Sequence, residues 1–300
     1  GYFLAIAEEG EQQLRGERQQ WWLDRLEVEH DDLRVALSWQ AERVGDDTGL
    51  RLAASLWRFW VLRGYLNEAS EWLERLLAAP TSTSESAESK SLRAKALSAA
   101  GVVACDRGEY GHAETHHQEC LALRRDLGDD RGVAAALNNL GILACDIGHP
   151  VRATAYHEES LDIKRKLGDR PGIAATLNNL GLVASDRGEY ARALACFDES
   201  IAIKKELGDE RGISVTLNNQ ATVARKQGRH DTAASLFRQS LAMKHRFGDR
   251  EGMSFSLEGL ARVACATGDP ARAARLLGAA SALRRATGAL LPLADRADYE

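Results

Sequence analysis

The sequence predicts an all-α fold, a solenoid of helical hairpins stacked one on the next. Two sets of glycines recur at a step of 40 residues, and apolar residues between them follow the three-and-four spacing of amphipathic helices. The first set is Gly128-Asp129, Gly168-Asp169, Gly208-Asp209 and Gly248-Asp249, and the second is Gly108, Gly148, Gly188, Gly228 and Gly268. A fixed period of this size is typical of proteins whose units bury their apolar faces only against their neighbours. The long, regular surface of such a fold favours binding over catalysis.

Residues 131–170 show how one unit is expected to fold. Gly148 supplies the left-handed conformation that ends a first helix, and Pro150 stands in the first turn of a second helix, where its missing N–H costs nothing. Gly168 ends the second helix, and Asp169 is placed to cap the helix that follows. Each repeat is therefore a helical hairpin that ends in a Gly-Asp junction.

The same register divides the whole chain. In chain order, we expect an irregular N-terminal helical section at 1–80 that ends in a degenerate repeat at 47–79, a loop at 81–91, five 40-residue repeats at 92–289, and a truncated C-terminal segment at 290–300. In the N-terminal section, Tyr2 to Arg15 and Gln19 to Glu42 are expected to form two helices. Their expected buried stripe consists of Trp21, Trp22, Leu26, Leu33 and Leu37.

Composition and charge limit the function classes. With 44% hydrophobic residues in 300 positions, the chain can bury a large core, yet no stretch approaches the roughly 18 apolar residues of a membrane span. Five cysteines without a CxxC pair and the absence of a signal peptide predict a cytoplasmic protein. Residues 1–90 carry 17 Asp and Glu against 10 Lys and Arg, and the remaining residues carry 27 against 29, so neither part is a nucleic-acid surface by bulk charge. The chain begins at Gly1 rather than at a methionine, so we expect it to be a fragment of a longer protein.

The motifs that mark enzymes are missing from the sequence. There is no GxxxxGK[ST], GxSxG, HExxH or CxxC, and the glycines stand at helix ends. We therefore expect no catalytic residue, no metal site and no cofactor, and any ATPase activity would lie in sequence outside this chain.

Several residues resemble the tetratricopeptide repeat. Gly181, Ala193 and Phe197 show its pattern of two small residues followed by an aromatic, and Ala233 with Phe237 repeats it. The 40-residue period and the LNNLG motif resemble the variety found in kinesin light chains and spindle-orientation adaptors. The resemblance implies a right-handed superhelix of tetratricopeptide-like hairpins. Departures are His117 and His157 at the aromatic position, and Leu257-Glu258-Gly259-Leu260-Ala261 in place of LNNLG.

A second resemblance covers nearly the whole chain. The strings YFLAIAEEGEQQLRG, WWLDRLEVEHDDLRVALSW, LRLAASLWRFWVLRGYLNEASEWLERLL and ARLLGAASALRRATGALLPLADRADYE look like the C-terminal half of bacterial STAND-class ATPases, which are often linked to LuxR-type or winged-helix DNA-binding domains. In that family the helical array is the sensor arm of the regulator. The family usually continues past the last of these strings, so the chain is expected to stop before its natural cap.

Two sets of asparagines are the expected binding residues. Asn138, Asn178 and Asn218 recur at a position that resembles the groove-facing one of the tetratricopeptide repeat, and Asn139, Asn179 and Asn219 lie beside them. Because an amide carries both a donor and an acceptor, a row of amides can bind the backbone of an extended peptide without selecting its side chains. Alternatively, one Asn in each repeat bonds a neighbouring helix and is purely structural.

Charged residues at the expected groove positions change sign along the array. Asp106, Asp146 and Asp186 are followed by Arg225, Lys226 and Arg262, so a ligand with one basic and one acidic end would be oriented. Equally, the aspartates could merely close the first helix of each hairpin. A basic row at the end of each second helix, formed by Arg124, Lys164, Lys204, Lys244 and Arg284, would meet an acidic partner or simply complement the helix dipole.

The expected function is that of a non-catalytic sensor or regulatory arm of a larger bacterial signal-transducing ATPase or transcriptional regulator, which binds an extended peptide or a partner in its concave groove. A stand-alone tetratricopeptide adaptor for protein–protein interaction and a receptor for a short signalling peptide are the alternatives. The expected partner is a protein, a peptide, or another domain of the same full-length protein, with no direct nucleic-acid contact in this fragment and no membrane contact.

Overall fold

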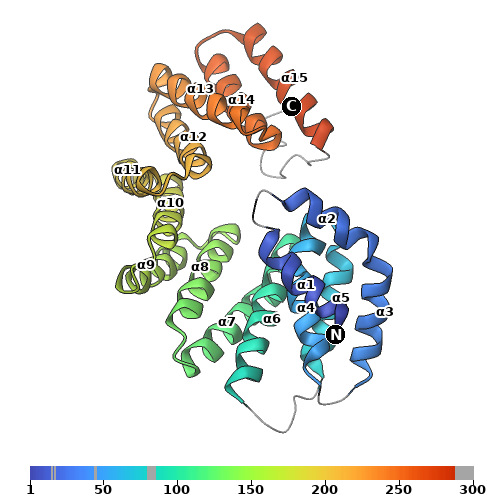
Figure 1. The fold of residues 1–300 in the computed structure, drawn as a ribbon. Coiled ribbons are helices and arrows are strands. Elements are labelled where there is room, and N and C mark those ends of the chain that lie inside the picture. The colour runs from blue at the N-terminus through green and yellow to red at the C-terminus, as the bar shows by residue number, and fades with distance from the viewer. Residues whose placement is uncertain (15, 17, 44–45, 80–85, 288–300) are drawn as a thin grey trace. The chain divides into compact units, whose positions relative to one another are not determined.

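A computed structural model of the chain describes residues 1–14, 16, 18–43, 46–79 and 86–287. All regular structure in these residues is α-helical, which confirms the predicted class, and the chain divides into two compact units, Gly1–Ile163 and Lys164–Glu300 (Figure 1). The helices of the first unit are α1 (Tyr2–Gln13), α2 (Gln19–Val28), α3 (His30–Ala41), α4 (Thr48–Arg63), α5 (Leu66–Ala78), α6 (Ala87–Asp106), α7 (Tyr110–Asp126) and α8 (Asp130–Asp146). Helix α9 (Pro150–Lys166) contains the boundary, and the second unit continues with α10 (Arg170–Asp186), α11 (Tyr190–Leu207), α12 (Glu210–Lys226), α13 (His230–Arg246), α14 (Arg250–Ala266) and α15 (Pro270–Thr287).

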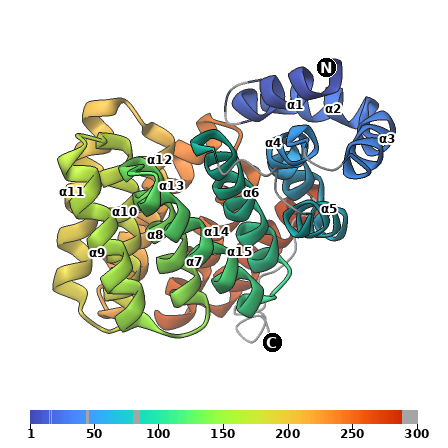
Figure 2. The same cartoon turned by 90° about the horizontal axis from the view of Figure 1, so that it is seen from below.

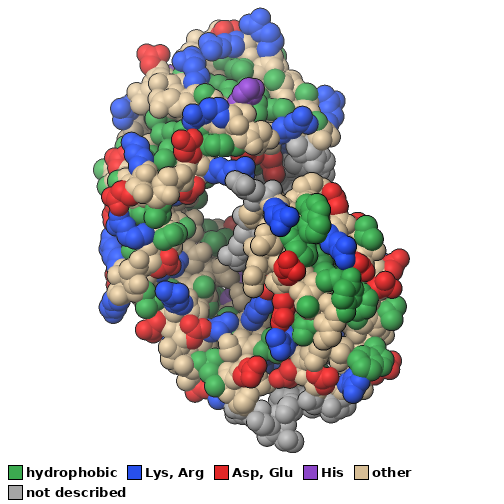
Figure 3. All heavy atoms as spheres, viewed as in Figure 1, with side chains coloured by type: hydrophobic (Ala, Val, Ile, Leu, Met, Phe, Trp, Pro, Cys, Tyr) green, Lys and Arg blue, Asp and Glu red, His purple; other side chains and the backbone are tan. Residues whose placement is uncertain are grey.

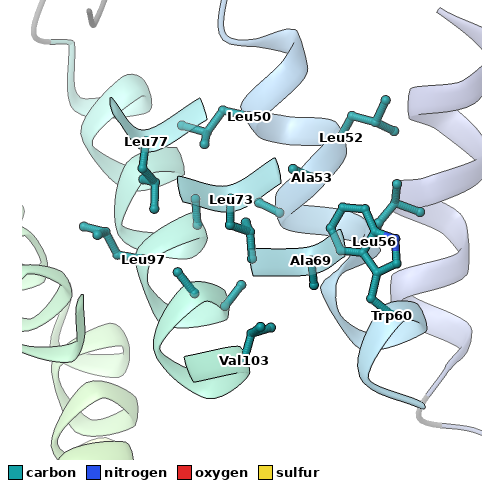
Figure 4. Packing of buried hydrophobic residues seen from close by; sticks show 14 of the residues in the cluster. Leu50, Leu52, Ala53, Leu56, Trp60, Ala69, Leu73, Leu77, Leu97 and Val103 are labelled. Carbon is teal, nitrogen blue, oxygen red and sulfur yellow. The ribbon is translucent and has the colours of Figure 1, made fainter. Parts of the chain in front are cut away.

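The core of the first unit lies where α4, α5 and α6 meet. Leu56 and Trp60 of α4, Leu73 of α5 and Leu97 of α6 are all buried in one apolar cluster (Figure 4). Helices α1 and α3 pack on α4, so the N-terminal section and the repeats that follow share a continuous core within this unit.

The N-terminal section differs from the prediction in two respects. The single helix expected over Gln19 to Glu42 is two helices that meet at Glu29. The break places His30 at the start of α3, where its ring is buried against Phe59 and its Nε2 lies 3.0 Å from a carboxylate oxygen of Glu68. Trp21, expected in the buried stripe, is 54% exposed, whereas the other four residues of that stripe are buried.

The second unit repeats one arrangement three times. Each first helix (α10, α12, α14) packs on its own second helix (α11, α13, α15), and α12 also contacts α10 and α14 (Figures 1 and 2). Neighbouring first helices therefore form a common surface within this unit, and the second helices form the other layer.

The corners of the hairpins are formed as the sequence predicts. Gly148 and Gly168 adopt left-handed φ values of 77° and 66° after α8 and α9. Asp169 caps α10 because its side chain accepts a hydrogen bond from the backbone N–H of Gly172 at 3.1 Å. A Cβ at Gly172 would overlap the Asp169 carboxylate, so glycine is required three residues after the capping aspartate.

A second glycine in each repeat makes room for a ring. Rings of the second helices occupy the space that a Cβ would fill at Gly101, Gly141 and Gly181, and these rings belong to His117, His157 and Phe197, respectively. All three rings are buried. The glycine of LNNLG is thus a packing residue, and histidine at the aromatic position preserves the contact.

The fourth repeat changes partners at this contact. Ala221 stands where the earlier repeats have glycine, and the ring of Phe237, which shares a buried cluster with Ala221, fills the space that a Cβ would need at Gly259 of α14. The irregular Leu257-Glu258-Gly259-Leu260-Ala261 sequence therefore compensates for the alanine one repeat earlier.

Two predicted connections are only partly described. Residues 80–85 lie outside the described residues, and α6 begins at Ala87 with Ser86 as its cap, so the later part of the loop expected at 81–91 is helical. The expected C-terminal segment at 290–300 also lies outside the described residues.

Candidate functional site

Each unit has a candidate first-helix face, which we define as the half-exposed and exposed residues of α6 and α8 in the first unit and of α10, α12 and α14 in the second. Large apolar side chains are exposed on each face, with exposed fractions of 42% for Ile142 in the first unit and of 40% for Leu182 and 46% for Val215 in the second. All six predicted asparagines are half-buried residues of these helices. Each face therefore combines apolar side chains with amides, a composition suited to binding a polypeptide.

In the second unit a chain of hydrogen bonds connects a buried lysine to the asparagines. The Nζ of Lys204 donates a hydrogen bond to the Thr216 hydroxyl at 2.7 Å. That hydroxyl in turn donates to the Oδ1 of Asn178 at 3.1 Å. The same Oδ1 accepts a second hydrogen bond from the Nδ2 of Asn219 at 3.0 Å. The carbonyl group of the Asn178 side chain is thus held by the next repeat.

The following repeat contains the same chain of bonds. Lys244 donates to the Ser256 hydroxyl at 3.2 Å, and Ser256 donates to the Oδ1 of Asn218 at 3.0 Å. Lys204 and Lys244 also donate to backbone carbonyls of their neighbouring first helices, at Gly212 and Gly252 respectively. We call this arrangement the lysine–hydroxyl–asparagine chain.

The direction of these bonds orients the asparagine amides. The Oδ1 of Asn178 accepts from the Nδ2 of Asn219 and lies 3.1 Å from the Thr216 hydroxyl, whose hydrogen also has the Gly212 carbonyl oxygen within 3.1 Å. The Nδ2 groups of Asn178 and Asn218 donate to no other described residue. Each amide consequently presents its two N–H donors on the first-helix face, already held in one orientation.

The remaining asparagines have different surroundings. Asn219 donates to Asn178, so in this repeat the second-set asparagine links two repeats, as the structural alternative predicts. The Nδ2 of Asn139 lies 3.5 Å from the Ser98 hydroxyl, at the limit of a hydrogen bond. Asn138 and Asn179 are half-buried and also interact with other residues.

The lysines of the basic row are buried, unlike basic side chains that only complement the helix dipole at the surface. Lys204 and Lys244 are 8% and 3% exposed, and Lys164, which donates to Thr176 at 2.7 Å, is equally buried. Burial lowers the pKa of all three, to about 8 for Lys244, although Asp249 opposes that change. The basic row is therefore a set of inter-helix donors, a role that the recurrence of Thr176, Thr216 and Ser256 at 40-residue steps could have revealed.

The predicted change of charge is partly neutralised within the second unit. Lys226 forms an ion pair with Asp186 at 3.0 Å, and its Nζ lies 3.3 Å from the hydroxyl of the buried Ser185. Arg225 and Arg262 are half-buried and have interaction partners of their own. Less net positive charge therefore faces solvent here than the sequence suggests.

The acidic residues of the first unit are arranged differently. Asp106 and Asp146 end α6 and α8, and burial raises the pKa of both carboxyl groups. Asp146 raises the pKa of Asp106 further, and burial together with both carboxylates raises the pKa of the Cys105 thiol to about 11. Neither carboxylate forms an ion pair with a described residue. Their negative charge is available to a basic group on the first-helix face.

The N-terminal helices expose a second apolar area. Tyr2, Val35 and Trp39 line a pocket of about 430 Å³ between α1, α3 and α4, and apolar side chains are visible over α2 and α3 in Figure 3. No helix in the described part of the chain is long and apolar enough to cross a membrane. Among the described residues, no cluster of three His, Cys, Asp or Glu side chains has the arrangement of a metal site.

Comparison with known proteins agrees with the repeat structure. A tetratricopeptide repeat family model matches residues 92–166, 150–206, 172–246 and 212–286. A search of curated protein sequences finds no match.

Solved structures of several tetratricopeptide-type proteins are similar. The apo form of RapI aligns over 96% of this chain and 99% of its own, with 16% identity and a TM-score of 0.71. NprR in complex with its cognate peptide NprX aligns over 90% and 78%, with 14% identity and a TM-score of 0.63. A kinesin-light-chain repeat structure from Podosopora anserina aligns over 66% and 97%, with 18% identity and a TM-score of 0.54. Identities this low demonstrate a shared fold only. With the family match extending over more than half of its length, the chain belongs to the tetratricopeptide repeat family, and its fold is an all-α solenoid of tetratricopeptide-like hairpins.

Proposed function

We propose that the chain is a non-catalytic binding arm that holds an extended peptide, or an extended segment of a partner protein, on its first-helix face. The observation that carries this proposal is the orientation of Asn178 and Asn218, whose N–H donors are presented on that face while their oxygens are held by the next repeat. Donors fixed before binding lose little conformational entropy when they meet the backbone carbonyls of a ligand.

The charges of each unit add a preference for ligand type. Asp106 and Asp146 would attract a basic group of the ligand to the first unit, because neither carboxylate has a cationic partner among the described residues. Partial neutralisation of Lys226 by Asp186 leaves the amides and apolar residues as the main contacts in the second unit. The first unit thus favours a basic ligand segment and the second unit an apolar one.

The structural neighbours support a peptide as the ligand class. NprR was solved in complex with its cognate peptide, and its fold resembles this chain over most of its length. The resemblance of the sequence to STAND-class regulators favours a larger bacterial signal-transducing protein, in which peptide binding would control an ATPase or a DNA-binding domain.

The amide donors can be tested without disturbing the repeats. Asn178→Asp and Asn218→Asp keep the oxygen that accepts from Thr216 or Ser256 but remove both N–H donors, whereas alanine would also break the bonds between repeats. Peptides would be selected on the wild-type chain from a display library of random 12-residue sequences, and their affinities measured by fluorescence anisotropy. We expect the double variant to lose about tenfold to a hundredfold in affinity at an unchanged melting temperature, because each lost hydrogen bond is worth about 0.5–1.5 kcal/mol.

Two results would contradict the proposal. An unchanged affinity of the double variant would exclude the asparagines as ligand donors, and failure to select any peptide would favour a stand-alone adaptor that recognises a folded partner. The regulator context has a separate test, namely the reading frame upstream of Gly1. A phosphate-binding GxxxxGK[ST] loop there would support an ATPase arm, and an intact frame without that loop would favour the adaptor or a receptor for a short signalling peptide.

A further inference from the structure

A small pocket opens between α12 and α14 on the first-helix face of the second unit. Its volume is about 330 Å³, near the lower end of the roughly 300–1,000 Å³ of ligand pockets, so one side chain fits it better than a whole ligand does. Val215 of α12 and Phe255 of α14 form its apolar sides, with exposed fractions of 46% and 38%. The other residues that line it are Asn218, Asn219, Lys244, Asp249, Glu251 and Gly252.

The repeats differ at two positions, one that forms the apolar side of this pocket and one that sets the charge of its rim. The side chain at the apolar position becomes larger along the array, in the order Ala135, Ala175, Val215 and Phe255. All four residues are exposed. The position at its rim is Arg131, Pro171, Arg211 and then Glu251, so an acidic residue appears only in the last of these repeats. Packing of one repeat on the next does not require these changes, because the earlier repeats pack with a small residue and with no acid there.

The polar groups of the pocket define what it would hold beside an apolar side chain. The Nδ2 of Asn218 is a donor with no partner among the described residues, and Asn218 lines a pocket that can admit a ligand carbonyl. Lys244 and Asp249 are opposite charges close enough to influence each other, and both also bond backbone groups of α14. The exposed Glu251 forms no ion pair with a described residue and leaves the rim negative.

We propose that this pocket binds a branched aliphatic or aromatic side chain of a peptide whose next residue is Lys or Arg. The apolar side chain lies between Val215 and Phe255, the backbone carbonyl of that residue accepts from Asn218, and the basic neighbour pairs with Glu251. The inference rests on the proposed peptide-binding function and names the ligand class of one subsite.

Three synthetic tetrapeptides test the subsite by titration into the ¹⁵N-labelled full chain and observation of backbone amide chemical shifts. They are acetyl-Gly-Leu-Lys-Gly-amide, acetyl-Gly-Leu-Glu-Gly-amide and acetyl-Gly-Ser-Lys-Gly-amide. We expect the first to shift the resonances of Val215, Asn218 and Phe255. Replacing Leu by Ser should weaken binding about tenfold, through lost apolar burial. Replacing Lys by Glu should weaken it about threefold, because the rim contact is a solvent-exposed ion pair.

Matched variants locate the effect. Phe255→Ala and Val215→Ala should each weaken the Leu-Lys peptide, and Glu251→Arg, which introduces the residue type of Arg211, should reverse the preference between Lys and Glu. Leu207→Ala, which removes an exposed apolar side chain of the second helix α11, away from the first-helix face and outside the pocket, should change nothing. Absence of shifts at the pocket with all three peptides, or equal affinity for the three, would overturn the inference. If the library peptides still depend on Asn178 and Asn218 in that case, the subsite fails while the proposed function stands.

Discussion

In the first unit an imidazole lies against the glycine of a neighbouring helix, whereas in the second unit a phenyl ring occupies the equivalent place. His117 and Phe197 are both almost fully buried, and each fills the space that a Cβ would need at Gly101 or Gly181. Burial lowers the pKa of His117 to about 4, with a smaller contribution from His116, so its ring is neutral near pH 7. The same shape is thus obtained with a side chain that titrates and with one that does not.

The cation that joins one repeat to the next also differs between Arg124 and the lysines of the second unit. Arg124 of the first unit bonds Asp129 at 2.7 Å and the Ser91 hydroxyl at 3.2 Å, whereas the corresponding residues Lys204 and Lys244 of the second unit are buried lysines. A guanidinium keeps its charge at every pH a protein tolerates, but a buried ammonium does not. Both units therefore gain stability as pH rises but in different ranges, the first through His117 between about pH 4 and 6.5 and the second through Lys244 between about pH 8 and 10.5.

The largest expected effect is the loss of the ring in the second unit. Phe197→Ala should lower the free energy of unfolding by about 3–5 kcal/mol, because a buried phenyl ring is removed and a cavity remains beside Gly181. His117→Ala should cost less than about 2 kcal/mol at pH 7, because it also removes a buried Nδ1 that has no hydrogen-bond partner. Urea unfolding of both variants measures the difference, and equal losses would show that the rings are energetically equivalent.

A smaller effect is expected from acid. The folded-state pKa of His117, about 4, lies below the ordinary value of 6.5, so the unfolded chain binds the proton more readily and stability falls as pH falls through this range. Between pH 7 and pH 5 this residue should remove about 2 kcal/mol. His117→Phe should abolish that part of the pH dependence, as measured by urea unfolding at both pH values. His112→Phe, at an exposed position of the same helix, is the control and should leave it unchanged.

The smallest expected effect concerns the lysines of the second unit. The pKa of Lys244 is about 8 in the folded chain against 10.5 ordinarily, so the unfolded chain binds its proton more tightly and stability rises as pH increases between these values. The gain from pH 7 to pH 9 should be about 1 kcal/mol. Lys244→Met should show a correspondingly smaller rise in its unfolding free energy over this interval. A rise as large as that of the wild type would assign the alkaline effect to other groups.

Much of the fold could be predicted because its determinants are local. The left-handed glycines such as Gly148 and the capping aspartates such as Asp169 act within a few residues, so their spacing alone defines the hairpins. The break at Glu29 could not be read in the same way, because it depends on the contacts of His30 with Phe59 and Glu68, far along the chain. Helical periodicity continues through Glu29, so the local sequence does not mark the break.

The positions of the candidate site were predictable, but its hydrogen bonds were not. The 40-residue recurrence indicated Asn178 and Asn218, yet the bond from Thr216 to Asn178 joins residues 38 positions apart in different repeats. The ion pair between Lys226 and Asp186 likewise joins neighbouring repeats and reverses the expectation that both charges face a ligand. Neither pair lies within a single repeat, so the sequence of one repeat cannot reveal either of them.

The junction between repeats has a consequence for how such a chain can change in length. Gly168-Asp169 and Gly208-Asp209 have the same two residues, the same left-handed glycine and the same capping bond to the glycine three residues further on. Excision of residues 169–208 would join Gly168 to Asp209 and restore an identical turn. Whole repeats can therefore be lost or duplicated without creating an unfamiliar connection, whereas a deletion that removes one junction and only part of a repeat would leave a helix without its cap.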